Sequence, residues 1–537
     1  MKKVPFTALI SLLILALVIP LFNIRLQSAG ATGSKYKQSI TNKEINLTKL
    51  CSNLENHASD EEIIEALFSL SIKQNSSLLI QLFDKTNDYH LQRVLLQQLK
   101  QNLLLHEGQK NYISWFLWQN AKYAAPLLAQ ESLVALVEAK EQNALSFLVQ
   151  NIETNKLAAY PDGQFVQIPW YISKQICKQY PNSDFAKGIK AYEEISGTPF
   201  FDIDKKTERQ YGDNQYNPSL EIEEWLKWIK KYPGHIASDS AAYRLGRCYE
   251  ISGYYSQALN WYYQAVKAPN GAIQNDAKGR LIYVLDVKMD ADQLNDALTS
   301  QKICPEVEPA AKYTLALKLI RSGKYQVGIA KLQKFAQEYE EKPVYNFTFD
   351  KSQNDKTDKW AFWSKVKEQQ AKLTELSAYA QQLDNTELSA PLQYKIAALI
   401  YHDNLIFYNH FWQGQRIIYN WLGHINEIRN QPPVQTELQN SIKEQNNYYQ
   451  ALQKFLELKD KELPPDLKEK VIFSIALCYS HLESYGQEID VLMSEEMQHK
   501  QVLDSLKNYL NNYPNGNYRT EAEKALTAYQ SSKVKPK

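Results

Sequence analysis

Few residues in this chain of 537 combine the types and spacing that catalysis or metal binding requires. The nine histidines are scattered, and His402, His410 and His424 are eight and fourteen residues apart, which does not place two ligands one helical turn apart. Adjacent carboxylates such as Glu193 and Glu194 point away from each other on a helix. We therefore expect no metal site and no cofactor.

The glycine pattern excludes the common nucleotide-binding and hydrolase motifs. No two glycines are separated by a single residue, and none lie four apart, so neither a dinucleotide fingerprint nor a nucleophile elbow is present. Gly323 and Gly328 are five apart, but Ile329-Ala330 follows where a phosphate-binding loop has Lys and Ser or Thr. The lone carboxylate in Gln130-Glu131-Ser132 is typical of a solvated helix face. We predict that the protein is not an enzyme.

Aromatic side chains are the remaining candidates for ligand chemistry, because their faces stack on sugar rings as well as fill protein cores. Eight of them crowd one region that the sequence predicts to be helical: Tyr394, Tyr401, Phe407, Tyr408, Phe411, Trp412, Tyr419 and Trp421. We interpret them first as core packing. The alternative is a surface that binds carbohydrate or peptidoglycan, or that helps to process glycans.

The elements that must position these residues are helices. Glycine and proline number only 18 and 20, which favours long helices over turn-rich sheets. Apolar residues recur at three- and four-residue intervals, as in Ile63, Leu67 and Leu70. Ser59 and Glu62 form a capping-box pattern just before this run. The sequence predicts an all-α fold.

Net charge and cysteine content exclude further classes of partner and of structural site. Lysine plus arginine number 61 against 60 acidic residues, so the net charge of +1 predicts no nucleic-acid partner. The five cysteines are odd in number and far apart, which favours core packing over a disulfide framework or a zinc site. Cys248 and Cys304 are the nearest candidates for a pair.

A repeat unit can be identified between residues 239 and 272. Leu245-Gly246, Tyr249, Ala258 and Tyr262 have the spacing of the tetratricopeptide repeat, a helical hairpin of about 34 residues. A second unit begins near Pro309, 70 residues after Asp239, so one degenerate hairpin is expected between the two. The pattern predicts an α-solenoid of helical hairpins.

A recurring Tyr-Pro turn supports this periodicity. It occurs at Tyr180-Pro181, Tyr232-Pro233 and Tyr513-Pro514, each followed by turn-forming residues. Proline cannot continue a helix, so each Tyr-Pro should mark a helix end.

From Trp225 to Glu250 the chain resembles tetratricopeptide proteins of bacterial envelopes, notably the helical lipoprotein of outer-membrane barrel assembly and the Tol-Pal accessory protein. The likeness is clear over roughly 120 residues. It implies a non-catalytic scaffold that mediates protein–protein interactions in the cell envelope, with unknown protein partners.

The N-terminus carries an export signal. Lys2 and Lys3 precede an apolar run from Val4 to Phe22, 19 residues that can just span a bilayer. Ala29-Gly30-Ala31 has the small-residue pattern of a cleavage site, so a cleaved signal peptide and a membrane anchor are both open. In either case the remaining chain lies outside the cytoplasm, in the periplasm or on the extracytoplasmic face of the membrane. Membrane contact is expected through this segment if it is uncleaved.

These patterns divide the chain into seven segments. They are a signal peptide or anchor (1–31), a polar tether (32–46), a divergent helical-hairpin region (47–200), a tetratricopeptide-like array (201–341), a polar loop (342–359), a long-helix aromatic-rich region (360–463), and C-terminal hairpins with a cap (464–530).

Helix geometry predicts where a partner would bind. The repeat pattern assigns Leu245, Gly246 and Tyr249 to packing, which leaves a different stripe on the same helix. The predicted partner-binding residues are Tyr243, Arg247 and Glu250, with Tyr313 and Arg321 near the equivalent stripe 70 residues on. The resemblance implies that this stripe faces the concave surface of the array. The alternative is that these side chains are buried against neighbouring hairpins.

Overall fold

The structure is a computed structural model. It describes residues 46–56, 59–69, 75–158, 166, 168–197, 200–201, 218–267, 273–340, 356–382, 389–403, 406–412, 432–484 and 495–532. Within these residues every regular element is a helix, which confirms the predicted all-α class. The predicted signal or anchor, and the tether up to residue 45, lie outside them. No helix in the described ranges is both long and apolar enough to cross a membrane.

The chain forms two compact units, Met1–Ile189 with Gly234–Ile236, and Lys190–Pro233 with Ala237–Lys537. We call them unit 1 and unit 2. The helices described in unit 1 are α3 (Leu47–Glu55), α4 (Asp60–Ser69), α5 (Ser76–Lys85), α6 (Tyr89–Leu105), the short η1 (Glu107–Gln109), α7 (Lys110–Tyr123), α8 (Pro126–Glu138), α9 (Ala144–Asn155), α10 (Trp170–Gln179) and the first turns of α11 (Asp184–Ser196).

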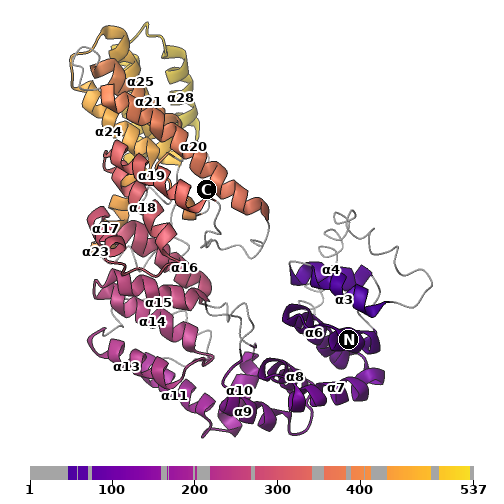
Figure 1. The fold of residues 1–537 in the computed structure, drawn as a ribbon. Coiled ribbons are helices and arrows are strands. Elements are labelled where there is room, and N and C mark those ends of the chain that lie inside the picture. Colours follow the sequence, from indigo (N-terminus) through magenta and orange to yellow (C-terminus); the bar gives the residue numbers. More distant parts are fainter. Residues whose placement is uncertain are drawn as a thin grey trace, which may run out of the picture. The chain divides into compact units, whose positions relative to one another are not determined.

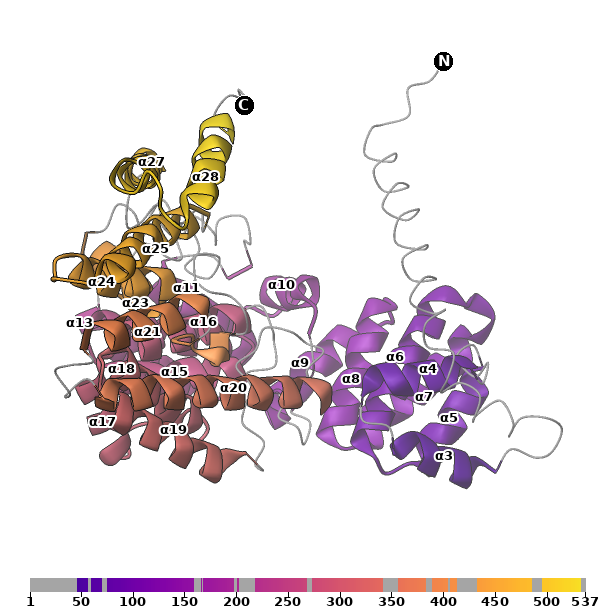
Figure 2. The ribbon, with the colours of Figure 1, turned by 90° about the horizontal axis from the view of Figure 1, so that it is seen from above.

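Helix α6 is the centre of the N-terminal part of unit 1 (Figure 2). It packs against α3, α4, α5, α7 and α8. Leu91, Leu95 and Leu99, spaced four apart in the sequence, are fully buried along it. Asp88 begins the helix, because its Oδ1 accepts a hydrogen bond of 2.7 Å from the backbone N–H of Leu91. At α4 the predicted capping box is present, with Ser59 and Glu62 bonding each other's backbone N–H.

Unit 2 begins with successive helices that pack on their neighbours along the chain (Figure 1). They are the end of α11, α13 (Pro218–Lys231), α14 (Ser238–Ile251), α15 (Tyr255–Lys267), α16 (Gln274–Tyr283), a π-helical turn η3 (Val284–Lys288), α17 (Ala291–Thr299), α18 (Glu308–Arg321) and α19 (Tyr325–Tyr339). Pairs α14–α15 and α18–α19 are the two hairpins expected from the repeat spacing. Helices α16, η3 and α17 lie between them.

The two hairpins turn in the same way at positions 70 residues apart. Gly253 has φ of 78° and Gly323 has φ of 81°, a left-handed conformation that glycine adopts without steric cost. Each glycine N–H bonds to the carbonyl three residues back, at 3.0 and 2.9 Å, and the next N–H bonds five residues back, at 2.9 Å in both. The hairpin turn is therefore repeated in detail.

A small residue lets the helices of each hairpin approach closely. In α14 a Cβ at Gly246 would lie 2.7 Å from the ring of Tyr262 on α15. In α19 a Cβ at Gly328 would lie 2.5 Å from the side chain of Ile320 and 2.8 Å from the carbonyl oxygen of Ala316. The glycine has changed helix between the two hairpins, but the close contact is present in both.

The three Tyr-Pro turns end helices as predicted. Helices α10 and α13 end one residue before Tyr180 and Tyr232, and α27 (Glu495–Asn512) ends one residue before Tyr513. Each tyrosine N–H bonds to the carbonyl four residues back, at 2.8 to 2.9 Å.

The C-terminal part of unit 2 includes the three longest described helices, α20 (Lys356–Gln381), α25 (Pro465–Ser484) and α27, and there α27 packs on α25 and α28 (Arg519–Ser532) packs on α27 (Figure 2). The other helices described there are α21 (Ser389–His402), the short η6 (His410–Trp412), α23 (Pro432–Gln445) and α24 (Asn447–Lys459). Two expectations need correction. The predicted polar loop 342–359 ends earlier, because α20 begins at Lys356, and the aromatic-rich region is not helical throughout, because α21 ends at His402.

Candidate interaction sites

Two of the predicted binding residues, Arg247 and Glu250, form part of a buried charge network, and a third, Tyr243, lies beside it. The carboxylate of Glu250 accepts hydrogen bonds from Arg247 at 2.8 Å and from the hydroxyl of Tyr262 at 2.5 Å, and Arg280 of α16 bonds both of its oxygens. Burial raises the pKa of Glu250, but Arg247, Arg280 and Tyr262 together lower it to about 2. Tyr243 is buried beside this network, with its ring centroid 5.7 Å from that of Tyr262.

The other two predicted residues belong to a second buried network. Arg321 forms an ion pair with Asp286 of η3 and donates from Nε to the carbonyl oxygen of Phe407 at 2.9 Å. Tyr313 donates its hydroxyl to Gln369 Oε1 at 2.6 Å. Both residues thus hold other parts of unit 2 in place.

This second network explains how residues 406–409 can be buried without being helical. Buried carbonyl groups need hydrogen-bond partners. Gln369 of α20 donates hydrogen bonds to the carbonyls of Ile406 and Tyr408, at 3.2 and 2.8 Å. Arg321 donates one to the carbonyl of Phe407. Asn409 donates to the hydroxyl of Thr314 at 2.9 Å.

The expectation of an exposed binding stripe is therefore corrected. Tyr243, Arg247, Glu250, Tyr313 and Arg321 are all buried, with no more than 8% of any of them exposed. The reason is that α14 and α18 are covered on more than one side, by the other helix of their own hairpin and by further helices of unit 2. These side chains are instead buried against neighbouring helices, which was the alternative interpretation of the sequence. Arg280, Asp286 and Gln369, which complete the networks, lie in segments without the repeat signature.

The aromatic cluster is largely internal where the structure describes it. Phe407, Tyr408 and Phe411 are buried, and Tyr394 and Tyr401 are half-buried. The side chain of Trp412, together with Tyr419 and Trp421, lies outside the described residues.

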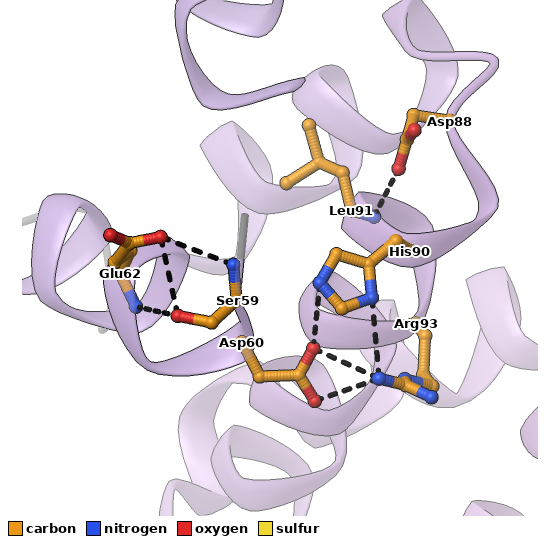
Figure 3. A network of polar contacts seen from close by, with 7 residues as sticks. All are labelled: Ser59, Asp60, Glu62, Asp88, His90, Leu91 and Arg93. Carbon is orange, nitrogen blue, oxygen red and sulfur yellow. Dashed lines mark hydrogen bonds and ion pairs between the residues drawn. The ribbon is translucent and has the colours of Figure 1, made fainter. Parts of the chain in front are cut away.

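A half-exposed Asp–His pair occurs in unit 1, where it joins α4 to α6 (Figure 3). Asp60 Oδ1 lies 3.0 Å from Nε2 of His90, and both Asp60 oxygens lie 2.9 Å from Arg93. In a hydrolase the second ring nitrogen would face a nucleophile. Here it faces Arg93, with Nδ1 of His90 3.3 Å from the guanidinium. The arrangement suits an anchor between two helices.

His235 is the other histidine in a tight contact within unit 1. Its Nε2 lies 2.9 Å from the carbonyl oxygen of Phe185, and a Cβ at Gly188 would lie only 2.6 Å from the same nitrogen. Burial lowers the pKa of His235 to about 4, although its hydrogen bond to Phe185 acts in the opposite direction. Burial therefore outweighs the hydrogen bond and favours the neutral ring.

The remaining groups singled out in the sequence have structural contacts. All five cysteines are free thiols, so Cys248 and Cys304 are not paired. Gln130 is buried, and its amide bonds the carbonyl of Lys156 at 2.6 Å and the N–H of Ala158 at 2.8 Å. Within the described part of the chain, no three His, Cys, Asp or Glu side chains are grouped to hold a metal ion.

An open groove lies between α24, α25 and α27 in unit 2, with a volume of about 280 Å³. Its floor consists of Ile472, Ile475 and Tyr479 of α25. One wall is formed by polar residues of α27 that are three or four positions apart and therefore lie on one face of the helix: Gln501, Asp504, Ser505 and Asn508. Leu456 and Lys459 of α24 form the opposite wall. An apolar floor with amide and hydroxyl groups beside it can hold a side chain and bond the backbone of a short peptide segment.

Comparison with protein-family models finds no match for this chain, and comparison with curated proteins finds none either.

Proposed function

We propose that the protein is a non-catalytic scaffold of tetratricopeptide-like hairpins that binds other proteins in the cell envelope. The observation that carries the proposal is the repetition, 70 residues apart, of one hairpin turn together with one close helix contact. Tandem hairpins of this kind form extended surfaces suited to binding other proteins. The likeness of residues 225–250 to envelope proteins and the N-terminal apolar run support an extracytoplasmic location, with the chain either anchored or released.

The partner-binding site that we propose is the groove of α24, α25 and α27. It replaces the buried stripe of α14, because a partner needs side chains that it can reach. Asp504 and Asn508 are exposed on the wall formed by α27, so they are accessible without unfolding. The groove volume is at the lower end for small-molecule sites and fits one anchoring side chain of a peptide.

The test is affinity capture from a bacterial envelope extract, with the full-length chain as bait and mass spectrometry as readout. The variant Asp504→Lys with Asn508→Lys should remain folded, because both residues are exposed. We expect it to lose the captured protein, since two lysines would block the groove and, with Lys459, make its lining strongly positive. Lys507→Asp is the matched control, because it changes an exposed charge on the same helix outside the groove.

Equal capture by the wild type, the groove variant and the control would place the partner elsewhere on the molecule. Capture of glycan without any protein would favour the alternative of a carbohydrate- or peptidoglycan-binding helper. That alternative relied on the aromatic cluster 394–421, whose described residues are buried or half-buried.

A further inference from the structure

The outward face of α7 carries aromatic rings where a surface helix usually carries charge. Ile113, Phe116 and Leu117 are buried on one side of the helix. On the opposite side Tyr112, Trp115 and Tyr123 are 44%, 58% and 80% exposed. A helix that is apolar on both faces is normally covered on both faces.

The exposed rings continue beyond α7. Tyr112 and Trp115 stack, with centroids 6.4 Å apart and planes 11° apart. The half-buried Trp118 meets the exposed Phe147 of α9 edge to face at 5.5 Å. Leu104 and Leu105, the last residues of α6, are also exposed. Contiguous apolar surface of this kind marks a contact with another protein or with a membrane.

The charges around these rings distinguish between those two partners. Helix α7 itself contains no aspartate or glutamate, the nearest in sequence being the exposed Glu107 before it and Glu131 after it, while Lys110 and Lys122 lie near its two ends. Protein interfaces are depleted in lysine. Tryptophan and tyrosine with flanking lysine are characteristic of the membrane–water interface, where the rings lie at headgroup level and lysines meet anionic phosphates.

The position of α7 relative to the start of the described chain is consistent with a membrane contact. The apolar run ends at Phe22, and 24 residues (23–46) separate it from α3. Helices α3 and α7 both pack against α6, so the first described helix belongs to the same helical cluster as these rings.

We propose that the α7 face, defined as Tyr112, Trp115, Trp118 and Tyr123 with Lys110 and Lys122, docks on the surface of a bilayer that contains anionic lipid. An uncleaved N-terminal segment would hold the α7 face near the membrane, so a weak contact would then suffice. This docking goes beyond the scaffold role and rests on the envelope location proposed for it and on retention of the N-terminal segment. No partner protein is involved, so the test below can fail while the scaffold proposal stands.

Tryptophan fluorescence provides the test, because none of the ten tryptophans lies in residues 1–46. The full-length chain is reconstituted into vesicles of about three parts phosphatidylcholine to one part phosphatidylglycerol, with and without brominated phosphatidylcholine. Brominated lipid quenches only rings that enter the bilayer, so the N-terminal segment itself contributes no signal. We expect clear quenching for the wild-type chain.

Three variants assign the quenching to the α7 face. Tyr112→Gln with Trp115→Gln should reduce it by more than about half, including the part due to Trp118. Lys110→Glu with Lys122→Glu keeps every ring and should reduce the quenching by more than about half in the anionic vesicles, with little effect in pure phosphatidylcholine. Trp170→Gln removes an exposed tryptophan of α10 and should leave the quenching by α7 intact. Far-UV circular dichroism verifies that each variant is folded.

Absence of quenching in the wild type would overturn the proposal, and so would quenching that survives in both α7 variants. Soluble peptidoglycan fragments are a parallel arm. A change in tryptophan emission with these fragments but not with brominated lipid, lost in the variant Tyr112→Gln with Trp115→Gln, would identify the α7 face as a glycan surface and would equally overturn it.

Discussion

Glu250 shows at the level of one residue why a charged side chain can be part of a helical core. It lies within α14, and its carboxylate has three side-chain donors, Arg247 three residues before it, Tyr262 on the facing helix and Arg280 on α16. A buried carboxylate without such donors would be strongly destabilising. Each of the three is therefore as much a packing residue as the leucines beside it.

Replacing Glu250 by glutamine should destabilise unit 2 by about 3–5 kcal/mol, because Arg247 and Arg280 would remain buried without a counter-charge. Urea unfolding followed by circular dichroism measures the change. The control is Glu223→Gln, which removes one partner of a solvent-exposed pair with Lys227 and should change stability by less than about 0.5 kcal/mol. Similar values for both variants would show that the Glu250 network is not closed in solution.

His235 predicts a pH dependence of stability. Its folded-state pKa of about 4 is below the ordinary value of 6.5, so the neutral ring is favoured by folding. The corresponding stability is fully present above pH 6.5 and is lost as the pH falls toward 4. We expect up to about 3 kcal/mol from a shift of this size. His235→Gln keeps a donor for the carbonyl of Phe185 but cannot titrate, so its urea midpoint should fall less between pH 7 and pH 4.5 than that of the wild type. Equal falls would contradict the prediction.

The sequence predicted which residues share one side of α14, but it did not predict what covers that side. Tyr243, Arg247 and Glu250 do share one side of α14, as helix periodicity requires. Whether that side is open depends on Arg280, which lies 30 residues later in a segment without repeat spacing. Sequence periodicity reports which residues lie together on a helix, and it does not report how many sides of that helix are covered.

At the level of elements, the shared turn of α14–α15 and α18–α19 gives a matched pair of mutations. Gly253→Ala and Gly323→Ala should each destabilise unit 2 by about 1 kcal/mol, because alanine disfavours a positive φ. The two losses should agree, since both turns have the same hydrogen bonds. Thermal unfolding monitors them, with Gly108→Ala as a control where a Cβ meets no atom within 4 Å. A loss at only one glycine would mean that the hairpins are not equivalent.

Helix ends could be predicted where a proline or glycine follows the helix, as at the three Tyr-Pro turns. The end of α21 at His402 could not be predicted in this way. Residues 406–411 contain closely spaced aromatics that suggest a helix, yet the carbonyls of residues 406–408 accept hydrogen bonds from Gln369 and Arg321, 37 to 86 positions away in the chain. Hydrogen bonds over such separations leave no local pattern to read.

At the level of the whole molecule, the two units differ in their surfaces. Most of the large exposed apolar side chains that can be identified belong to unit 1, and only Leu220, Leu226, Ile251, Tyr254 and Val327 belong to unit 2. In unit 2 the aromatic residues mostly fill a continuous core. We infer that the two units have different roles: unit 1 provides an apolar contact surface, and unit 2 provides a stable helical array with a groove that has a polar wall.

One helix connects the two buried networks of that array. Arg280, near the end of α16, reaches Glu250 on α14, and Asp286, in the π-helical turn that continues α16, reaches Arg321 on α18. The two anchor points are six residues apart, roughly 9 Å along one rigid rod. A pull that separates α14 from α18 loads both ion pairs through this rod at once. Under tension α14, α16 and α18 should therefore separate together in one step. A regular array is expected to extend one hairpin at a time.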